Sequence, residues 1–174
     1  MMKKFVLLLI GVLALGQWGV AAAASDKPKL LMFDFALQDY MKSADGAADD
    51  PMMLRRTLDL SDEVRTYLKN EGRFSLVDNA QYRGAIEKVT GSRNFFACRA
   101  CYMAAAKTAG ANYVAVGWAQ RVSNLIIEFN FRVEEVATGK VVDKSYISIR
   151  GNSDKSWHDG AKFLMKDYQH HWSK

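Results

Sequence analysis

The most constraining feature of the sequence is an alternation of apolar and polar side chains over residues 125–133. The apolar positions are Leu125, Ile127, Phe129, Phe131 and Val133, and the polar positions between them are Glu128, Asn130 and Arg132. Because successive side chains of a strand point to opposite faces of a sheet, this pattern predicts a strand with one buried face and one face toward water. A turn at Thr138-Gly139 then predicts a hairpin into a second strand over residues 141–150.

The remaining elements are predicted by short apolar runs, by turn residues and by helix caps. Asp50-Pro51 is typical of a helix start, and Gly72 is typical of its end. We expect further strands over 29–37, 73–78 and 113–118, and further helices over 79–89, 98–108 and from 152 or 153 onward. The last helix has Trp157, Ala161, Leu164, Met165 and Tyr168 on one face. The expected fold class is α/β (α+β), with helices on a single mixed sheet of about five strands in the order β-α-β-α-α-β-β-β-α.

The first 24 residues have the layout of a secretory signal peptide. A basic start at Lys3 and Lys4 precedes an apolar run, and small residues precede an expected cut after Ala24. We therefore expect a signal peptide over 1–24, a single α/β domain over 25–174, a periplasmic location and no transmembrane segment after cleavage. A retained anchor is the alternative, since residues 5–24 are nearly long enough to span a membrane. Because no cysteine lies near residue 20, lipid anchoring is not expected.

Charge argues against a nucleic-acid partner. The chain of 174 residues carries a net charge of +5, and loss of Lys3 and Lys4 with the signal peptide lowers it to +3. The remaining lysines and arginines are scattered, so they form no basic run of the kind that binds a phosphate backbone.

Cys98-Arg99-Ala100-Cys101 is the one motif that suggests chemistry. At a helix start and beside Arg99, a cysteine thiol can acquire a lowered pKa, which a thiol-disulfide enzyme requires. A structural disulfide or a pair of buried thiols is favoured, because Pro28 and Pro51 both precede the motif and no later proline is available. Tyr102 stands where a haem-attachment motif needs histidine. Zinc would need two further ligands, so neither a metal nor another cofactor is expected.

Other polar positions give weaker signals. Asp45 and Asp49 lie in a polar segment over 38–50, which favours a solvated loop over a calcium site because the EF-hand pattern is missing. Asp34 lies between Phe33 and Phe35, so it must face water or find a partner. No nucleophile-histidine-acid set or nucleotide-binding glycine loop stands out, and an enzyme is not expected.

Several blocks carry a resemblance to a known family. They are ANYVAVGWAQRVSNLIIEFNFRVEEVATG over 111–139, Phe33-Asp34-Phe35, Gly72-Arg73-Phe74 and the segment 150–157. Together they resemble a family of exported proteobacterial proteins of unknown function, some of them lipid-anchored. More distantly, the chain is similar to the amino-terminal domain of TolB and to CsgG-type envelope proteins. The resemblance implies an α/β accessory or interaction domain in the periplasm, with envelope assembly as one possible role, and it supplies no catalytic residues.

Two functions follow as hypotheses. The first is a non-catalytic periplasmic interaction domain that binds another periplasmic or envelope protein. Its surface would comprise Asp45 and Asp49 in the 38–50 loop and Glu128, Asn130 and Arg132 on the outer face of the hairpin. The alternative is a periplasmic thiol-disulfide carrier that uses Cys98 and Cys101. The sequence leaves the partner, the pathway and the oligomeric state open.

Overall fold

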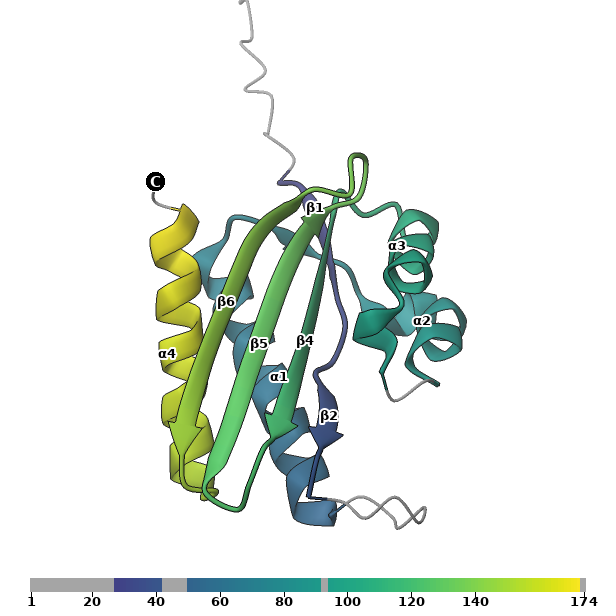
Figure 1. The fold of residues 1–174 in the computed structure, drawn as a ribbon. Coiled ribbons are helices and arrows are strands. Elements are labelled where there is room, and N and C mark those ends of the chain that lie inside the picture. Colours follow the sequence, from purple (N-terminus) through teal and green to yellow (C-terminus); the bar gives the residue numbers. More distant parts are fainter. Residues whose placement is uncertain (1–26, 42–49, 92–93, 173–174) are drawn as a thin grey trace, which may run out of the picture.

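The structure, a computed structural model, describes residues 27–41, 50–91 and 94–172 (Figure 1). The expected signal peptide over 1–24 and the candidates Asp45 and Asp49 lie outside the described residues. The elements are β1 (Lys29–Met32), β2 (Ala36–Asp39), α1 (Pro51–Glu71), β3 (Ser75–Leu76), η1 (Asn79–Tyr82), α2 (Arg83–Thr90), η2 (Phe95–Ala97), α3 (Arg99–Thr108), β4 (Tyr113–Arg121), β5 (Ile126–Glu135), β6 (Val141–Arg150) and α4 (Asp154–Trp172).

The strands form one mixed sheet, which confirms the predicted fold class. Its order is β3-β1-β4-β5-β6, and β2 pairs with β4 beyond the end of β1. Strand β1 runs parallel to β3 and β4, β2 is also parallel to β4, and β4, β5 and β6 are successively antiparallel. The long antiparallel strands β4 to β6 therefore make the larger part of the sheet, as Figure 1 shows.

The strand predicted over 29–37 is divided into β1 and β2. The ring of Phe35 lies over Gly117 of β4, where an added Cβ would be 2.5 Å from the ring. The backbone N–H of Phe35 donates to the Ser61 hydroxyl on α1 and not to a neighbouring strand. The chain therefore leaves the sheet between β1 and β2, so the sheet has six strands where about five were expected.

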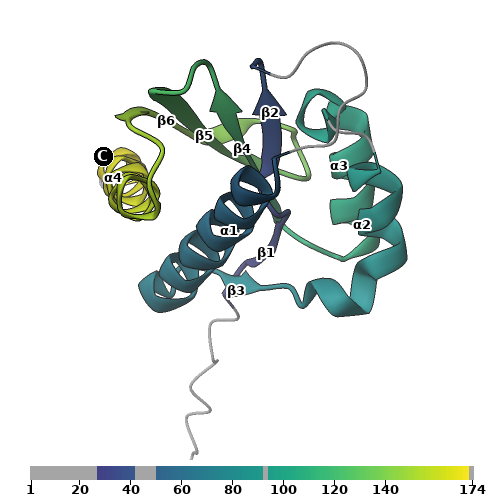
Figure 2. The ribbon, with the colours of Figure 1, turned by 90° about the horizontal axis from the view of Figure 1, so that it is seen from below.

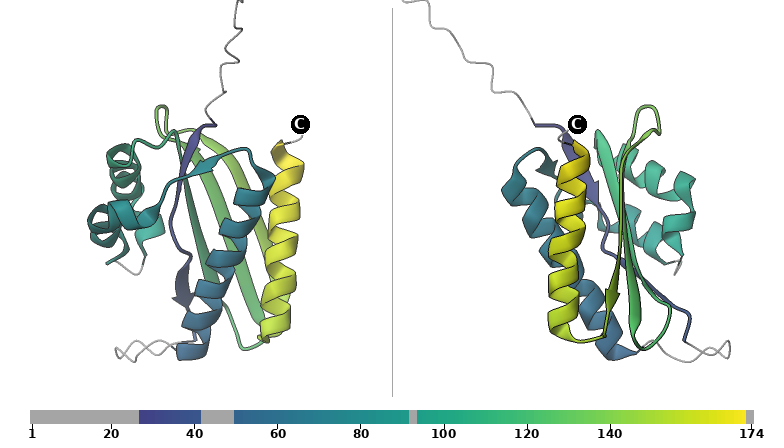
Figure 3. Two further views of the ribbon diagram at one scale, coloured as in Figure 1. Left: turned by 180° about the vertical axis from the view of Figure 1, so that it is seen from behind. Right: turned by 60° about the vertical axis from the view of Figure 1, so that its left-hand side comes forward.

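Helices cover the two faces of the sheet unequally. Helices α1 and α4 lie side by side on one face, and α2 and α3 pack on the other face against β1 and β4 (Figures 2 and 3). The first core contains Phe129 and Phe131 of β5 together with Leu164 and Tyr168 of α4. The second core is built around Tyr102 of α3 and the neighbouring side chains of β1 and β4. Helices therefore cover β5 and β6 mainly on one of the two faces of the sheet.

The helix predictions are largely confirmed. Asp50 accepts a hydrogen bond from the backbone N–H of Met52, and α1 ends where Gly72 adopts a φ of 75°. The helix is continuous through Ser61, whose buried hydroxyl donates to the Thr57 carbonyl. The predicted stripe of five side chains on α4 is buried in full. On α1, Leu60, Val64 and Leu68 are buried and Leu54 is exposed.

The hairpin of β5 and β6 agrees with its prediction from Ile127 to Val133, whose odd-numbered residues are buried. Leu125, predicted to belong to the buried row, is 70% exposed, because β5 begins only at Ile126 and Leu125 lies in the preceding turn. Strand β3 is shorter than the predicted 73–78, because after Val77 the chain turns into η1, where Asp78 caps the backbone N–H of Ala80. Within the described residues, no helix combines the length and the apolar character needed to cross a bilayer.

Candidate functional site

The face of β4, β5 and β6 that points away from α1 and α4 is here called the open face, because α2 and α3 cover only part of it. Figure 1 looks onto it. It includes the side chains of Trp118, Ile126, Glu128, Asn130, Arg132 and Tyr146, and the exposed Lys144, Ser148 and Arg150 of β6 lie on the same face. The register places Asn130 between Trp118 on β4 and Tyr146 on β6. The sequence candidates Glu128, Asn130 and Arg132 are therefore on one face, as the alternation predicted.

Three of these side chains are apolar or aromatic and reach solvent. Ile126 is 39% exposed and Tyr146 is 50% exposed. Trp118 is half-buried, because one face of its indole stacks on Phe96 of η2 at 4.7 Å between ring centroids and 7° between planes. The hydroxyl of Tyr146 hydrogen-bonds with the Glu128 carboxylate, and this bond raises the pKa of that hydroxyl. The open face thus combines aromatic surface with fixed polar groups, which is typical of protein interfaces.

One end of the open face is closed by an ionic network around Glu134. This carboxylate is 1% exposed and lies at the end of the polar row of β5. The Tyr102 hydroxyl donates to its Oε1 at 2.6 Å, and Arg99 Nε donates to its Oε2 at 2.7 Å. Arg132 Nε lies 2.7 Å from Oε1 as an ion pair, although its N–H is not directed at that oxygen. Both oxygens of Glu134 are therefore occupied.

Burial, and then the hydrogen bond to Glu134, raises the pKa of Tyr102 to about 12. Tyr102 therefore remains a hydrogen-bond donor throughout the physiological range. In the sequence, Tyr102 stands out only as the residue that excludes a haem motif, and Glu134 is marked only as a further polar position of the alternating segment.

Arg132 is held by several contacts within this network, so its guanidinium is not a free surface cation. Its guanidinium lies 5.7 Å from the centre of the Tyr102 ring and 5.8 Å from that of Trp118. Its Nη2 donates to the Phe96 carbonyl at 3.2 Å and to the Tyr102 hydroxyl at 2.8 Å. The Phe96–Trp118 stack and the Glu134 network are thus connected through one side chain.

Cys98 and Cys101 form a disulfide at the start of α3. Both residues are half-buried, and Arg99 and Tyr102 follow them directly in the helix. The disulfide therefore closes the turn that presents two of the three partners of Glu134. Among the described residues, no group of three histidine, cysteine or acidic side chains is placed to hold a metal ion.

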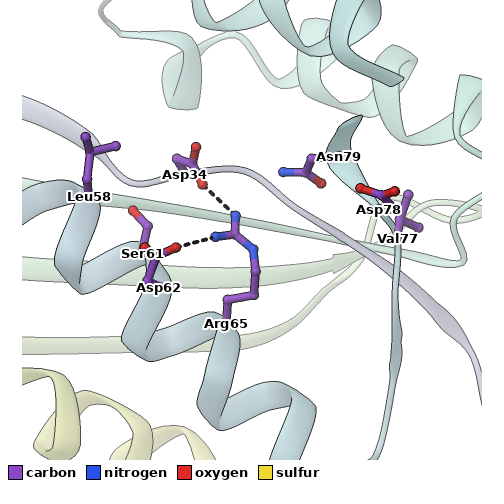
Figure 4. Close-up of a pocket in the computed structure, with 8 residues that line it drawn as sticks. All are labelled: Asp34, Leu58, Ser61, Asp62, Arg65, Val77, Asp78 and Asn79. Carbon is purple, nitrogen blue, oxygen red and sulfur yellow. Dashed lines mark hydrogen bonds and ion pairs between the residues drawn. The ribbon is translucent and has the colours of Figure 1, made fainter. Parts of the chain in front are cut away.

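A separate pocket of about 430 Å³ lies where the parallel strands β1 and β3 end (Figure 4). Asp34, which the sequence predicted to face water or find a partner, is exposed and pairs with Arg65 of α1 at 2.5 Å. Arg65 also pairs with Asp62 at 3.1 Å. Asp78 and Asn79 line the other side of the pocket. No sequence signal marked Arg65, because its partner Asp34 lies 31 residues away in the chain.

Comparison with known proteins places the chain among proteins without an assigned function. The family model DUF3280, described as "Protein of unknown function (DUF2380)", matches residues 28–168. The prediction of a family of unknown function is confirmed. No curated protein matches the sequence.

Several solved structures are similar to the chain. Lipoprotein GNA1162 from Neisseria meningitidis is 13% identical, with a TM-score of 0.55 over 84% of this chain and 97% of that chain, which shows a shared fold. The LpoB C-terminal domain from Salmonella enterica is 21% identical, with a TM-score of 0.49 over 74% of this chain and 87% of that chain. TolB from Acinetobacter baumannii is 14% identical, with a TM-score of 0.42 over 78% of this chain and 27% of that chain.

Proposed function

Because the chain belongs to the DUF3280 family of proteins of unknown function, its role has to be inferred from its own residues, and we propose that it is a non-catalytic periplasmic interaction domain. It binds another envelope protein through the open face. The observation that carries this proposal is the exposure of Ile126 and Tyr146 on the same sheet face as the half-buried Trp118, in the part of that face that α2 and α3 leave uncovered. The fold shared with a lipoprotein supports an envelope role.

The chemistry of the open face supports binding more than catalysis. A general base needs a free lone pair within reach of a substrate, and both oxygens of Glu134 are already bonded within the protein. Arg132 is fixed by two aromatic rings and a carbonyl, so it holds the shape of the surface. Rigid aromatic side chains lose little conformational entropy on binding, which makes Trp118 and Tyr146 suitable contacts.

The proposed location is the periplasm. Cleavage after Ala24 would release residues 25–174 as a single domain. A disulfide between Cys98 and Cys101 is consistent with an oxidising compartment, because such bonds persist outside the cytosol. The chain carries no cysteine near residue 20, so the proposal includes no lipid anchor.

Site-specific photo-crosslinking in the native host tests the proposed surface. A benzophenone side chain at position 146 should give a discrete protein adduct, and Ile126→Asp should abolish that adduct. The matched control is the same side chain at position 163, because Phe163 on α4 is 63% exposed on the opposite layer. Equal adducts at both positions, or an adduct that survives Ile126→Asp, would contradict the proposal.

A thiol-disulfide carrier is the second candidate, because the disulfide is half-buried at a helix start beside the exposed Arg99. A substrate thiolate would attack one sulfur of the bond, giving a mixed disulfide and a free thiolate on the other cysteine. A second substrate thiolate would then displace the bound cysteine, so that the substrate is oxidised and the Cys98–Cys101 pair reduced. If both cysteines of the reduced, folded protein resist alkylation, this candidate is excluded.

A further inference from the structure

The pocket at the ends of β1 and β3 shares no residue with the open face. It lies between α1 on one side and the start of η1 on the other (Figure 4). Because β1 and β3 are parallel, the segments that follow them, at Asp34 and at Val77, leave the sheet at the same edge. In open α/β sheets the crevice outside the carboxyl ends of parallel strands is the usual place for a small ligand. A volume of about 430 Å³ is in the range of small-molecule sites.

The polar groups around this pocket are mainly hydrogen-bond acceptors. Asp34 and Asp62 each use Oδ1 to bind Arg65, so each keeps a second carboxylate oxygen. The Asn79 amide donates through Nδ2 to the Met32 carbonyl at 2.9 Å, which leaves its Oδ1 as an acceptor. Asp78 adds a third carboxylate. With three carboxylates and one guanidinium, the lining is negatively charged overall.

The remaining lining is aliphatic or already bonded. Leu58 and Val77 form an apolar side of the pocket, and Leu58 is exposed. The buried Ser61 hydroxyl accepts from the Phe35 N–H and donates to the Thr57 carbonyl, so it supports the pocket without offering a free donor. A ligand that fits this lining donates hydrogen bonds, carries positive charge and has a short apolar part.

We propose that this pocket binds an organic cation, namely a primary ammonium or guanidinium group on a short aliphatic stem. The cationic group lies between Asp34 and Asn79, and the stem lies against Leu58 and Val77. Arg65 already illustrates the recognition, because its own guanidinium bridges Asp34 and Asp62. The same group can come from a free amine or from a lysine or arginine side chain of another protein. The proposal does not depend on the function assigned to the open face.

Isothermal titration of the purified protein at low ionic strength tests the site. The probes are 1,5-diaminopentane as a free amine, N-acetyl-lysine amide as a protein side chain, and glutarate as an anion of similar length. We expect saturable one-to-one binding of at least one cationic probe and none of glutarate. Binding of the diamine alone would identify a free amine as the source, and binding of the blocked lysine would identify a side chain. Absence of saturable binding by both cations, or equal binding of glutarate, would overturn the proposal.

Charge-matched variants separate the pocket from general electrostatic attraction. Asp34→Asn should weaken binding about tenfold, since it removes one charge-assisted hydrogen bond. Asp62→Asn changes a side chain that is 81% exposed and should also weaken binding while leaving the fold intact. Asp159→Asn on α4 removes the same charge away from the pocket and should change the affinity less than about twofold. If Asp159→Asn weakens binding as much as the pocket variants do, the attraction is not specific and the site is refuted.

Discussion

The two faces of strand β5 carry alternate residues of one segment, yet they differ in what covers them. Ile127, Phe129 and Phe131 are buried beneath α1 and α4, whereas Glu128 and Asn130 face the open side. The covered face stabilises the fold through apolar burial. The open face contains aromatic and charged groups held in place by neighbours, which is expected of a surface that binds. This difference predicts that substitutions on the two faces separate stability from binding.

The largest loss of stability is expected for Phe131→Ala on the covered face. The ring is buried between Phe35, at 6.0 Å between centroids, and Tyr168, at 5.8 Å. Its removal should lower the free energy of unfolding by about 3–5 kcal/mol through lost burial and a residual cavity. The neighbouring open-face substitution Asn130→Ala should cost about 0.5 kcal/mol or less. Urea denaturation measures both, and similar losses would remove the distinction between the faces.

Glu134→Ala tests a charged side chain that is buried at the end of the open face. The substitution leaves Arg132 and the Tyr102 hydroxyl without their acidic partner, so we expect a loss of about 3 kcal/mol. Glu128→Ala, two residues earlier on the same face, should cost about 1 kcal/mol or less because that carboxylate is only half-buried. Equal effects in urea denaturation would show that the Glu134 network does not stabilise the end of the open face.

The disulfide is expected to contribute less than either buried group. Cys98 and Cys101 are three residues apart, so the bond closes a short loop and restricts the unfolded chain only modestly. The chain-entropy estimate for so small a loop is about 2 kcal/mol, and Cys98→Ala with Cys101→Ala should lower the free energy of unfolding by about that amount. Reduction of the unsubstituted protein is the matched control. No change on reduction would show that the packing of α3 alone holds Arg99 and Tyr102 in place.

Alkaline pH provides a further test of the Glu134 network. The pKa of Tyr102 is about 12 in the folded protein and about 10 in the unfolded chain, because burial and Glu134 disfavour the phenolate. A group with a raised pKa contributes its full stability below the unfolded pKa, and that contribution is lost as pH rises from about 10 to about 12. Absorbance at 295 nm should show a tyrosine that titrates near the upper value and disappears in Tyr102→Phe. A Tyr102→Phe variant with an unchanged titration would contradict the assigned network.

Local patterns in the sequence predict those elements whose signals lie within a single helix or strand. The alternation in β5, the capping residues of α1 and the stripe on α4 each lie within one element, and the structure confirms them. The division between β1 and β2 was not predictable in this way, because it depends on the Phe35 ring meeting Gly117. Arg65 with Asp34, and Tyr102 with Glu134, likewise become partners only after α1 and α3 pack on the sheet. The periodic spacing of apolar residues does not indicate which side chains become partners across the fold.

Of these substitutions, Tyr146→Ser should have the smallest effect on stability, and it separates binding from stability most directly. The side chain is half exposed and its hydroxyl bonds to one carboxylate, so we expect a change of about 0.5 kcal/mol or less in the free energy of unfolding. Crosslinking to the partner through a benzophenone side chain at position 126 should nevertheless fall strongly, because an aromatic contact of the proposed interface is lost. Phe163→Ser removes an aromatic ring of similar exposure from α4, on the other side of the sheet from the open face, and should leave crosslinking unchanged. If both variants reduce crosslinking equally, exposed aromatic area alone explains the adduct and the open face has no special role.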